Sequence, residues 1–158
     1  MNAITNTADD EALWFGNSLV SIKLSSQDGA DGICVVEHWA PSGDAPPLHL
    51  HRNEDEVFHI IEGTMRFRVG DDERVAGRGE TVIGPKGIPH AYRVESADGA
   101  HYLTITRGAD FETMLRQASR PAGRAALPEP VVPTPETIER LVKACAENGI
   151  DILGPPIA

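Results

Sequence analysis

Two histidines one residue apart, with a third histidine downstream, constrain the fold of this chain more than any other feature of its sequence. His49 and His51 stand in the stretch GDAPPLHLHRNEDEVFHIIEG, and side chains two residues apart on a β-strand point to the same face. Glu56 joins that face only if the polar residues 52–55 turn or bulge. His90 closes a second stretch, GETVIGPKGIPH. Three imidazoles and one carboxylate suit a divalent transition metal (Fe, Mn, Ni, Cu or Zn), and octahedral geometry would leave two positions for water, O2 or substrate.

These two stretches resemble the two motifs of the cupin superfamily. The residues that fit the first motif at its spacing are Gly43, His49, His51, Glu56 and Gly63. Those that fit the second are Gly79, Pro85, Gly87 and His90. Val94 stands where the second motif has asparagine, which affects turn detail on that strand and none of the ligands. The resemblance covers roughly residues 31–107 and implies an all-β fold, a small jelly-roll barrel with one metal ion in its lumen.

A plainer interpretation has to be weighed against metal binding. A single histidine on an apolar strand is more often a hydrogen-bonded core residue than a ligand. Four potential ligands in two matched motifs are harder to explain in that way. The remaining alternative is a barrel that keeps the motifs but binds no metal, or uses these residues only to hold the fold together.

The overall charge bears on the partners of this protein. The net charge of -10 opposes binding to nucleic acid, since phosphates would be repelled. No stretch is long and apolar enough to predict a membrane span, and the polar N-terminus has no signal-peptide pattern. Cys34 and Cys145 both fall in apolar patterns and are predicted to be buried thiols. We therefore expect a cytoplasmic protein that acts on a small molecule.

Composition changes along the chain predict three segments. Residues 1–11 are polar and are expected to form a flexible N-terminus, and residues 12–109 carry the strand patterns of the barrel. Residues 110–158 contain two helical patterns, the second introduced by the strong start signal Thr134-Pro135-Glu136. This C-terminal helical extension is expected to pack on its own barrel or to reach a second subunit. The second arrangement would make a homodimer, which is common among cupins.

Strand alternation predicts which side chains share the lumen with the metal. Phe58 and Ile60 have the parity of Glu56, and Tyr92 has the parity of His90. Met65 and Phe67 form the apolar face of another strand. The predicted substrate pocket therefore consists of Phe58, Ile60, Met65, Phe67 and Tyr92. The three remaining histidines, His38, His59 and His101, are interpreted as ordinary strand residues. The parity of His59 predicts that it faces away from the metal.

Within the cupins, the chain most resembles the small quercetin 2,3-dioxygenase-like proteins. That resemblance implies O2-dependent cleavage of a flavonol or a related enolic aromatic, with Glu56 acting both as ligand and as general base. Two alternatives remain open. The same metal could serve a non-redox isomerase, lyase or cyclase of a small carbonyl compound, or the barrel could bind a small molecule without turnover.

Overall fold

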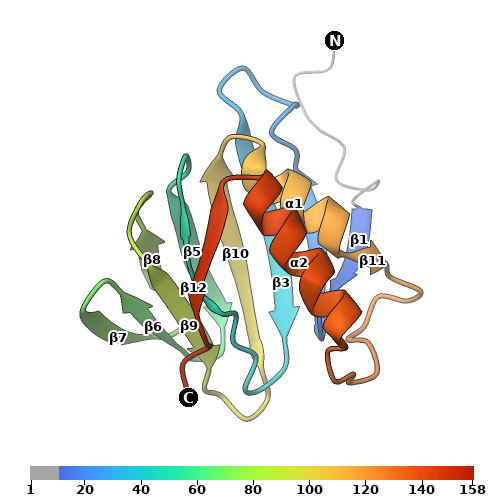
Figure 1. The fold of residues 1–158 in the computed structure, drawn as a ribbon. Coiled ribbons are helices and arrows are strands. Elements are labelled where there is room, and N and C mark those ends of the chain that lie inside the picture. Colours follow the sequence, from blue (N-terminus) through green and yellow to red (C-terminus); the bar gives the residue numbers. More distant parts are fainter. Residues whose placement is uncertain (1–10) are drawn as a thin grey trace.

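The computed structural model describes residues 11–158, which fold mainly into two antiparallel sheets that face each other (Figure 1). The first sheet has the order β11-β1-β2-β3-β10-β5-β8, with the bounds Arg120–Pro121, Glu11–Phe15, Ser18–Leu24, Ile33–Ala40, Ala100–Arg107, Glu56–Glu62 and Thr81–Gly84. The second has the order β12-β4-β9-β6-β7, with the bounds Ile150–Gly154, Leu48–His51, His90–Val94, Met65–Val69 and Asp72–Ala76. The all-β prediction is confirmed.

Two clusters of buried side chains fill the interior. One lies where the two sheets meet and contains Ala40, Phe58, Ile60, Met65, Phe67, Ala76, Val82, Val94, Ala100 and Tyr102. The other joins the first sheet to the C-terminal helices and contains Leu13, Val20, Ile22, Cys34, Val36, Phe111, Met114, Leu115, Ala144, Cys145 and Ile150. Both arise because strands such as β3 alternate buried and more exposed positions. Val94, which replaces the asparagine of the second motif, is 1% exposed and packs in the first of these clusters.

The two helices of the C-terminal extension are α1 (Asp110–Ala118) and α2 (Pro135–Glu147). Their buried side chains share a core cluster with β2 and β3, so both helices pack on their own barrel (Figure 1). Thr134 and Thr137 form a reciprocal capping box at the start of α2, which ends at Asn148 as its C-cap. The extension is not only helical, because β11 joins the first sheet and β12 joins the second.

The sequence also led us to expect a flexible N-terminus, two buried thiols and no membrane span. The predicted flexible segment 1–11 lies outside the described residues except for Glu11, which begins β1. Cys34 and Cys145 are free and buried, as predicted. Within residues 11–158, no helix has the length and apolar character that crossing a membrane requires.

Candidate metal centre

The four predicted ligands converge from both sheets. His49 and His51 lie on β4, and His49 is paired with His90 on the neighbouring β9. Residues 52–55 leave the second sheet after β4, and Glu56 begins β5 in the first sheet. Glu56 therefore reaches the histidines from the opposite sheet, which explains how its odd offset from His51 is accommodated.

The distances within this group are short. Nε2 of His51 and Nε2 of His90 each lie 2.9 Å from Oε2 of Glu56, and Nε2 of His49 lies 3.9 Å from the same oxygen. One ligand atom from each of the four residues can be chosen so that all lie within 4.8 Å of one another. His51, Glu56 and His90 are at most 4% exposed. The geometry thus gathers three imidazole nitrogens and a carboxylate in a site that is largely closed to bulk water.

Backbone carbonyls orient two of the rings. Nδ1 of His49 lies 2.7 Å from the carbonyl oxygen of Pro47, and Nδ1 of His90 lies 3.1 Å from that of Ile88. Since a carbonyl oxygen only accepts, each Nδ1 donates, so in the neutral ring Nε2 is the nitrogen left with a lone pair for a metal. This is the outer support that metal-ligating histidines usually have. Without a metal, Nε2 of His90 lies at hydrogen-bond distance, 2.9 Å, from Oε2 of Glu56.

The third ring provides the test of whether a metal fits. His51 is 2% exposed, and neither of its ring nitrogens has a hydrogen-bond partner. Its Nε2 is close to Glu56, but at an angle outside hydrogen-bond geometry. Buried polar atoms without a partner are uncommon and call for an explanation such as an ion. A divalent cation held by His49, His51, Glu56 and His90 would supply the missing partner of His51, so the residues present fit a metal.

Charge coupling within the site is strong. Burial alone would raise the pKa of Glu56, but the charge of His51 and the other two imidazoles around the carboxylate outweigh burial and hold that pKa well below its ordinary value. Burial in turn would lower the pKa of His51, yet the Glu56 carboxylate outweighs it and raises that pKa. Glu56 is therefore ionised at neutral pH, which is the state that both a ligand and a base require.

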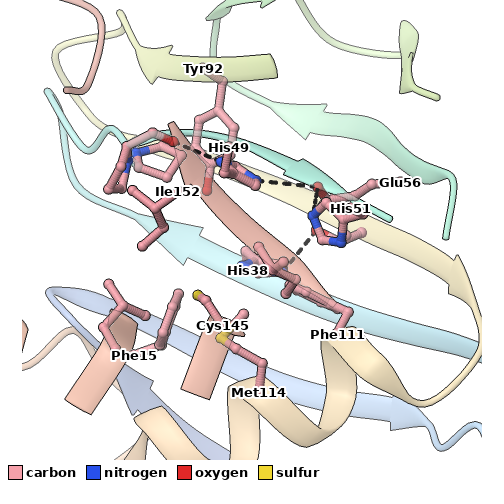
Figure 2. A pocket seen from close by; sticks show the side chains of 15 residues that line it. Phe15, His38, His49, His51, Glu56, Tyr92, Phe111, Met114, Cys145 and Ile152 are labelled. Atoms are coloured by element: carbon pink, nitrogen blue, oxygen red, sulfur yellow. Dashed lines mark hydrogen bonds and ion pairs between the residues drawn. The ribbon is translucent and has the colours of Figure 1, made fainter. Parts of the chain in front are cut away.

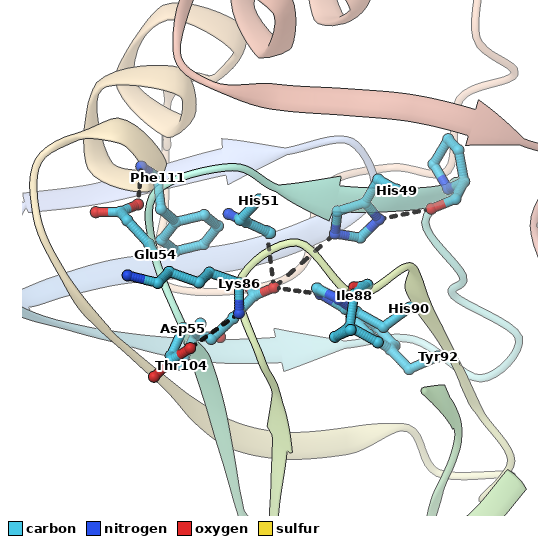
Figure 3. A network of polar contacts seen from close by, with 12 residues as sticks. His49, His51, Glu54, Asp55, Lys86, Ile88, His90, Tyr92, Thr104 and Phe111 are labelled. Carbon is cyan, nitrogen blue, oxygen red and sulfur yellow. Dashed lines mark hydrogen bonds and ion pairs between the residues drawn. The ribbon is translucent and has the colours of Figure 1, made fainter. Parts of the chain in front are cut away.

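The loop between β4 and β5 is anchored at two points (Figure 3). Oε1 of Glu54 accepts a hydrogen bond of 2.8 Å from the backbone N–H of Phe111 in the first turn of α1. Oδ1 of Asp55 accepts one of 2.9 Å from the backbone N–H of Lys86. Glu54 is only 2% exposed, and burial raises its pKa. These contacts hold the loop that positions His51 and Glu56. The sequence indicated only a polar turn here, because burial of Glu54 depends on α1.

A cavity lies beside the metal ligands, with a volume of about 70 Å³ that the centres of water-sized molecules can reach (Figure 2). It is lined by His49, His51 and Glu56 from the site, and by Phe15, His38, Pro46, Pro47, Tyr92 and Thr104 from the strands and loops around it. The C-terminal extension contributes Phe111, Met114, Leu141, Cys145, Ile150 and Ile152. Most of the wall is therefore apolar, and much of it comes from residues after the barrel.

The predicted substrate pocket and this cavity overlap at one residue, Tyr92. The other four predicted residues belong to the core cluster where the two sheets meet and are 2% exposed or less; they are Phe58, Ile60, Met65 and Phe67. Their side chains point inward as expected, but they pack against one another in the core and do not line the cavity. The open part of the interior lies toward α1, α2 and β12.

His38 is a cavity residue that the sequence analysis missed. Its Nε2 lies 2.9 Å from Oγ1 of Thr104, and burial lowers the pKa of His38 to about 4, so the ring is neutral at neutral pH. Its parity with Cys34 and Val36 on β3 was a signal that it points inward. His59 does lie outside the site, with Nδ1 2.8 Å from Oγ1 of the exposed Thr81.

Comparisons with known proteins place this geometry in context. A family model described as a cupin domain matches residues 35–106. Quercetin 2,3-dioxygenase from Bacillus subtilis is 24% identical over 96 residues, which are 61% of this chain and 28% of that protein. The chain thus spans little more than a quarter of the length of that relative.

Solved structures agree on the fold. A predicted oxalate decarboxylase from Thermotoga maritima has a TM-score of 0.59 at 15% identity, over 66% of this chain and 97% of that one. An RmlC-like cupin from Shewanella frigidimarina has a TM-score of 0.57 at 16% identity, over 69% of this chain and 93% of that one. Oxalate decarboxylase from Bacillus subtilis also has a TM-score of 0.57, at 18% identity, over 68% and 30% of the two chains.

Proposed function

We propose that this chain, whose residues 35–106 match a cupin-domain family model, is a metal-dependent dioxygenase of a small enolic or phenolic aromatic such as a flavonol. The observation that carries the proposal is the convergence of His49, His51, Glu56 and His90 at the edge of a mostly apolar cavity. The partial likeness to a quercetin 2,3-dioxygenase supports the choice of reaction.

The four ligands would hold one divalent transition-metal ion. Such an ion supplies Lewis acidity toward a substrate oxygen and, if it is redox-active, a means of using O2. Glu56 is ionised, and its Oε2 faces the point where the three imidazoles converge. It is therefore the group placed to accept the hydroxyl proton of an enol or phenol at this site. The apolar wall surrounds the rest of the substrate and keeps water away from it.

The lining of the cavity bears on the substrate class. None of the residues that line it among residues 11–158 is lysine or arginine, and His38 is neutral at neutral pH. A small dianion such as oxalate would therefore have no side-chain cation to neutralise its second charge. An aromatic body with one acidic hydroxyl matches the wall better, because most of its surface would contact apolar side chains.

The test combines metal analysis with oxygen consumption. We expect protein purified without chelator to contain Fe, Mn, Ni or Cu, and a flavonol to stimulate O2 uptake. Glu56→Gln should abolish turnover while retaining much of the metal, and Glu62→Gln, an exposed glutamate on the same strand, is the matched control. Full activity of Glu56→Gln would show that the general-base role is wrong. Zinc alone, with no O2 uptake, would instead favour a non-redox isomerase, lyase or cyclase, or a binding protein.

A further inference from the structure

The hydroxyl of Tyr92, a residue that lines the cavity, meets the hydroxyl of Tyr102. Tyr92 on β9 lines the cavity and projects into it (Figure 2), whereas Tyr102 on β10 is 1% exposed and belongs to the packed core. Their oxygens are 2.8 Å apart, which is a normal hydrogen-bond distance between hydroxyls. The distance alone leaves open which of the two donates.

The burial of Tyr102 decides the direction. Within the described part of the chain, the hydroxyl of Tyr102 has one hydrogen-bond partner, the hydroxyl of Tyr92. If Tyr92 donated, the proton of Tyr102 would be left without an acceptor in the core, which is an unfavourable arrangement. Tyr102 therefore donates to Tyr92. The proton of Tyr92 is then free to point into the cavity, where a bound molecule can accept it.

We propose that Tyr92 is a specificity-determining donor, which hydrogen-bonds to an oxygen of the bound substrate, and that Tyr102 is the residue that positions it. The inference rests on the proposed function, since it assigns the second recognition element of that same site. The ligand chemistry that it selects is an apolar or aromatic body with two oxygen functions, one directed to the metal ligands and one accepting from Tyr92. A ligand without the second oxygen would leave this donor unpaired.

Ring contacts hold both tyrosines in place. The ring of Tyr102 stacks on His38 with centroids 4.6 Å apart and an interplanar angle of 8°. The ring of Tyr92 lies 5.5 Å from that of Phe58 and 5.9 Å from that of Phe67. The hydroxyl of Tyr92 is therefore oriented before any ligand arrives, and little conformational freedom is lost on binding. This gives Phe58 and Phe67, which do not line the cavity, a supporting part in recognition.

Binding provides the first test. We would titrate 3-hydroxyflavone, followed by its fluorescence, into metal-containing protein under nitrogen so that no turnover occurs. Tyr92→Phe should weaken binding up to about tenfold, the loss expected for one hydrogen bond. Tyr102→Phe removes the same atom from a ring outside the cavity, and should weaken binding by about two- to threefold because Tyr92 is no longer polarised. Unchanged affinity of Tyr92→Phe would overturn the proposal.

Stability without ligand provides the second test and separates this proposal from the proposed function. If Tyr102 donates, Tyr102→Phe should lower the melting temperature, and adding Tyr102→Phe to Tyr92→Phe should restore part of what Tyr92→Phe loses. A Tyr102→Phe variant as stable as the parent, or more so, would mean that its hydroxyl was never satisfied, and would overturn the direction of the hydrogen bond. If the parent protein binds no flavonol, the substrate class in the proposed function is wrong and so is the ligand assigned to Tyr92, while the stability measurement still decides the direction.

Discussion

His51 on β4 lies directly opposite Ile150 on β12 in an antiparallel ladder. The strand that carries two of the ligands is thus flanked on one side by β9, with the third histidine, and on the other by the last strand of the chain. Ile150 is 2% exposed and lines the cavity, and the next inward residue of β12, Ile152, is paired with His49. The C-terminal extension is therefore part of the wall and the support of the metal site.

Shortening Ile150 should damage both the fold and the site. We expect Ile150→Ala to lower the free energy of unfolding by about 2–5 kcal/mol, the usual cost of deleting a large buried aliphatic side chain. Leu153→Ala on the same strand is the control, because Leu153 is 50% exposed and its loss should change the free energy by less than about 0.5 kcal/mol. Denaturant unfolding measures both variants. Equal effects of the two would contradict the arrangement of β12 described above.

Removing a ligand should abolish stabilisation by metal. His51→Gln should no longer bind a stoichiometric divalent ion, whereas His59→Gln, which alters a histidine outside the site, should bind it as the parent does. A free ion concentration of 100 times the dissociation constant adds about 2.7 kcal/mol to the free energy of unfolding. Melting curves with and without chelator should therefore separate for the parent and for His59→Gln, and coincide for His51→Gln. Separated curves for His51→Gln would remove it from the ligand set.

Protons should compete with the metal at His51. In the metal-free protein the pKa of His51 is raised above 6.5, so its stabilising charge is fully present below pH 6.5 and is lost as the pH rises through the raised value. The pKa of Glu56 is lowered from 4.5, so its contribution is present above pH 4.5 and is lost as the pH falls through the lowered value. The pair therefore stabilises the metal-free protein most between about pH 4.5 and 6.5.

Metal binding requires neutral His51, so its pH dependence has the opposite sign. The difference in melting temperature between metal-loaded and chelated protein should be larger at pH 8.5 than at pH 6. A series of melting curves in matched buffers would measure it. An equal difference in melting temperature at pH 6 and pH 8.5 would show that His51 carries no proton in the metal-free protein at pH 6.

Acid should destabilise the protein through His38. The pKa of His38 is lowered from 6.5 to about 4. The stability that its neutral ring contributes is therefore fully present above pH 6.5 and is lost as the pH falls toward 4. A shift of this size corresponds to about 3 kcal/mol. Between pH 6.5 and pH 4, the free energy of unfolding of metal-free His38→Gln should fall less than that of the metal-free parent. Denaturant unfolding at each pH measures both. Because His51 and Glu56 are present in both proteins, the difference isolates His38, and parallel curves would contradict the prediction.

Filling the cavity from α2 should block ligand binding without removing the metal. Leu141 is partly buried and lines the cavity, while the adjacent Val142 is 45% exposed on the outer side of the helix. Leu141→Trp should weaken binding of a flavonol at least about tenfold, because the indole would occupy space that the ligand needs. Val142→Trp should bind as the parent does. Metal content by elemental analysis should equal that of the parent in both variants, and undiminished flavonol binding by Leu141→Trp would place the ligand elsewhere.

The metal ligands and the barrel were accessible from the sequence because both depend on short-range rules. Alternation along a strand puts His49 and His51 on one face, and motif spacing relates Glu56 and His90 to them. The same alternation correctly directed Phe58 and Phe67 inward. It could not say which part of the interior is filled, because that depends on how side chains from strands distant in sequence pack against one another.

Tertiary structure alone decided the wall of the cavity and the state of several buried groups. Leu141 and Ile150 reach the site only because α2 and β12 fold back over the barrel, and nothing in their local pattern names the surface that they cover. The low pKa of His38 and the direction of the hydrogen bond from Tyr102 follow from burial, which is a property of the packed molecule. Sequence thus determined which atoms can bind a metal, and long-range packing determined what space those atoms face.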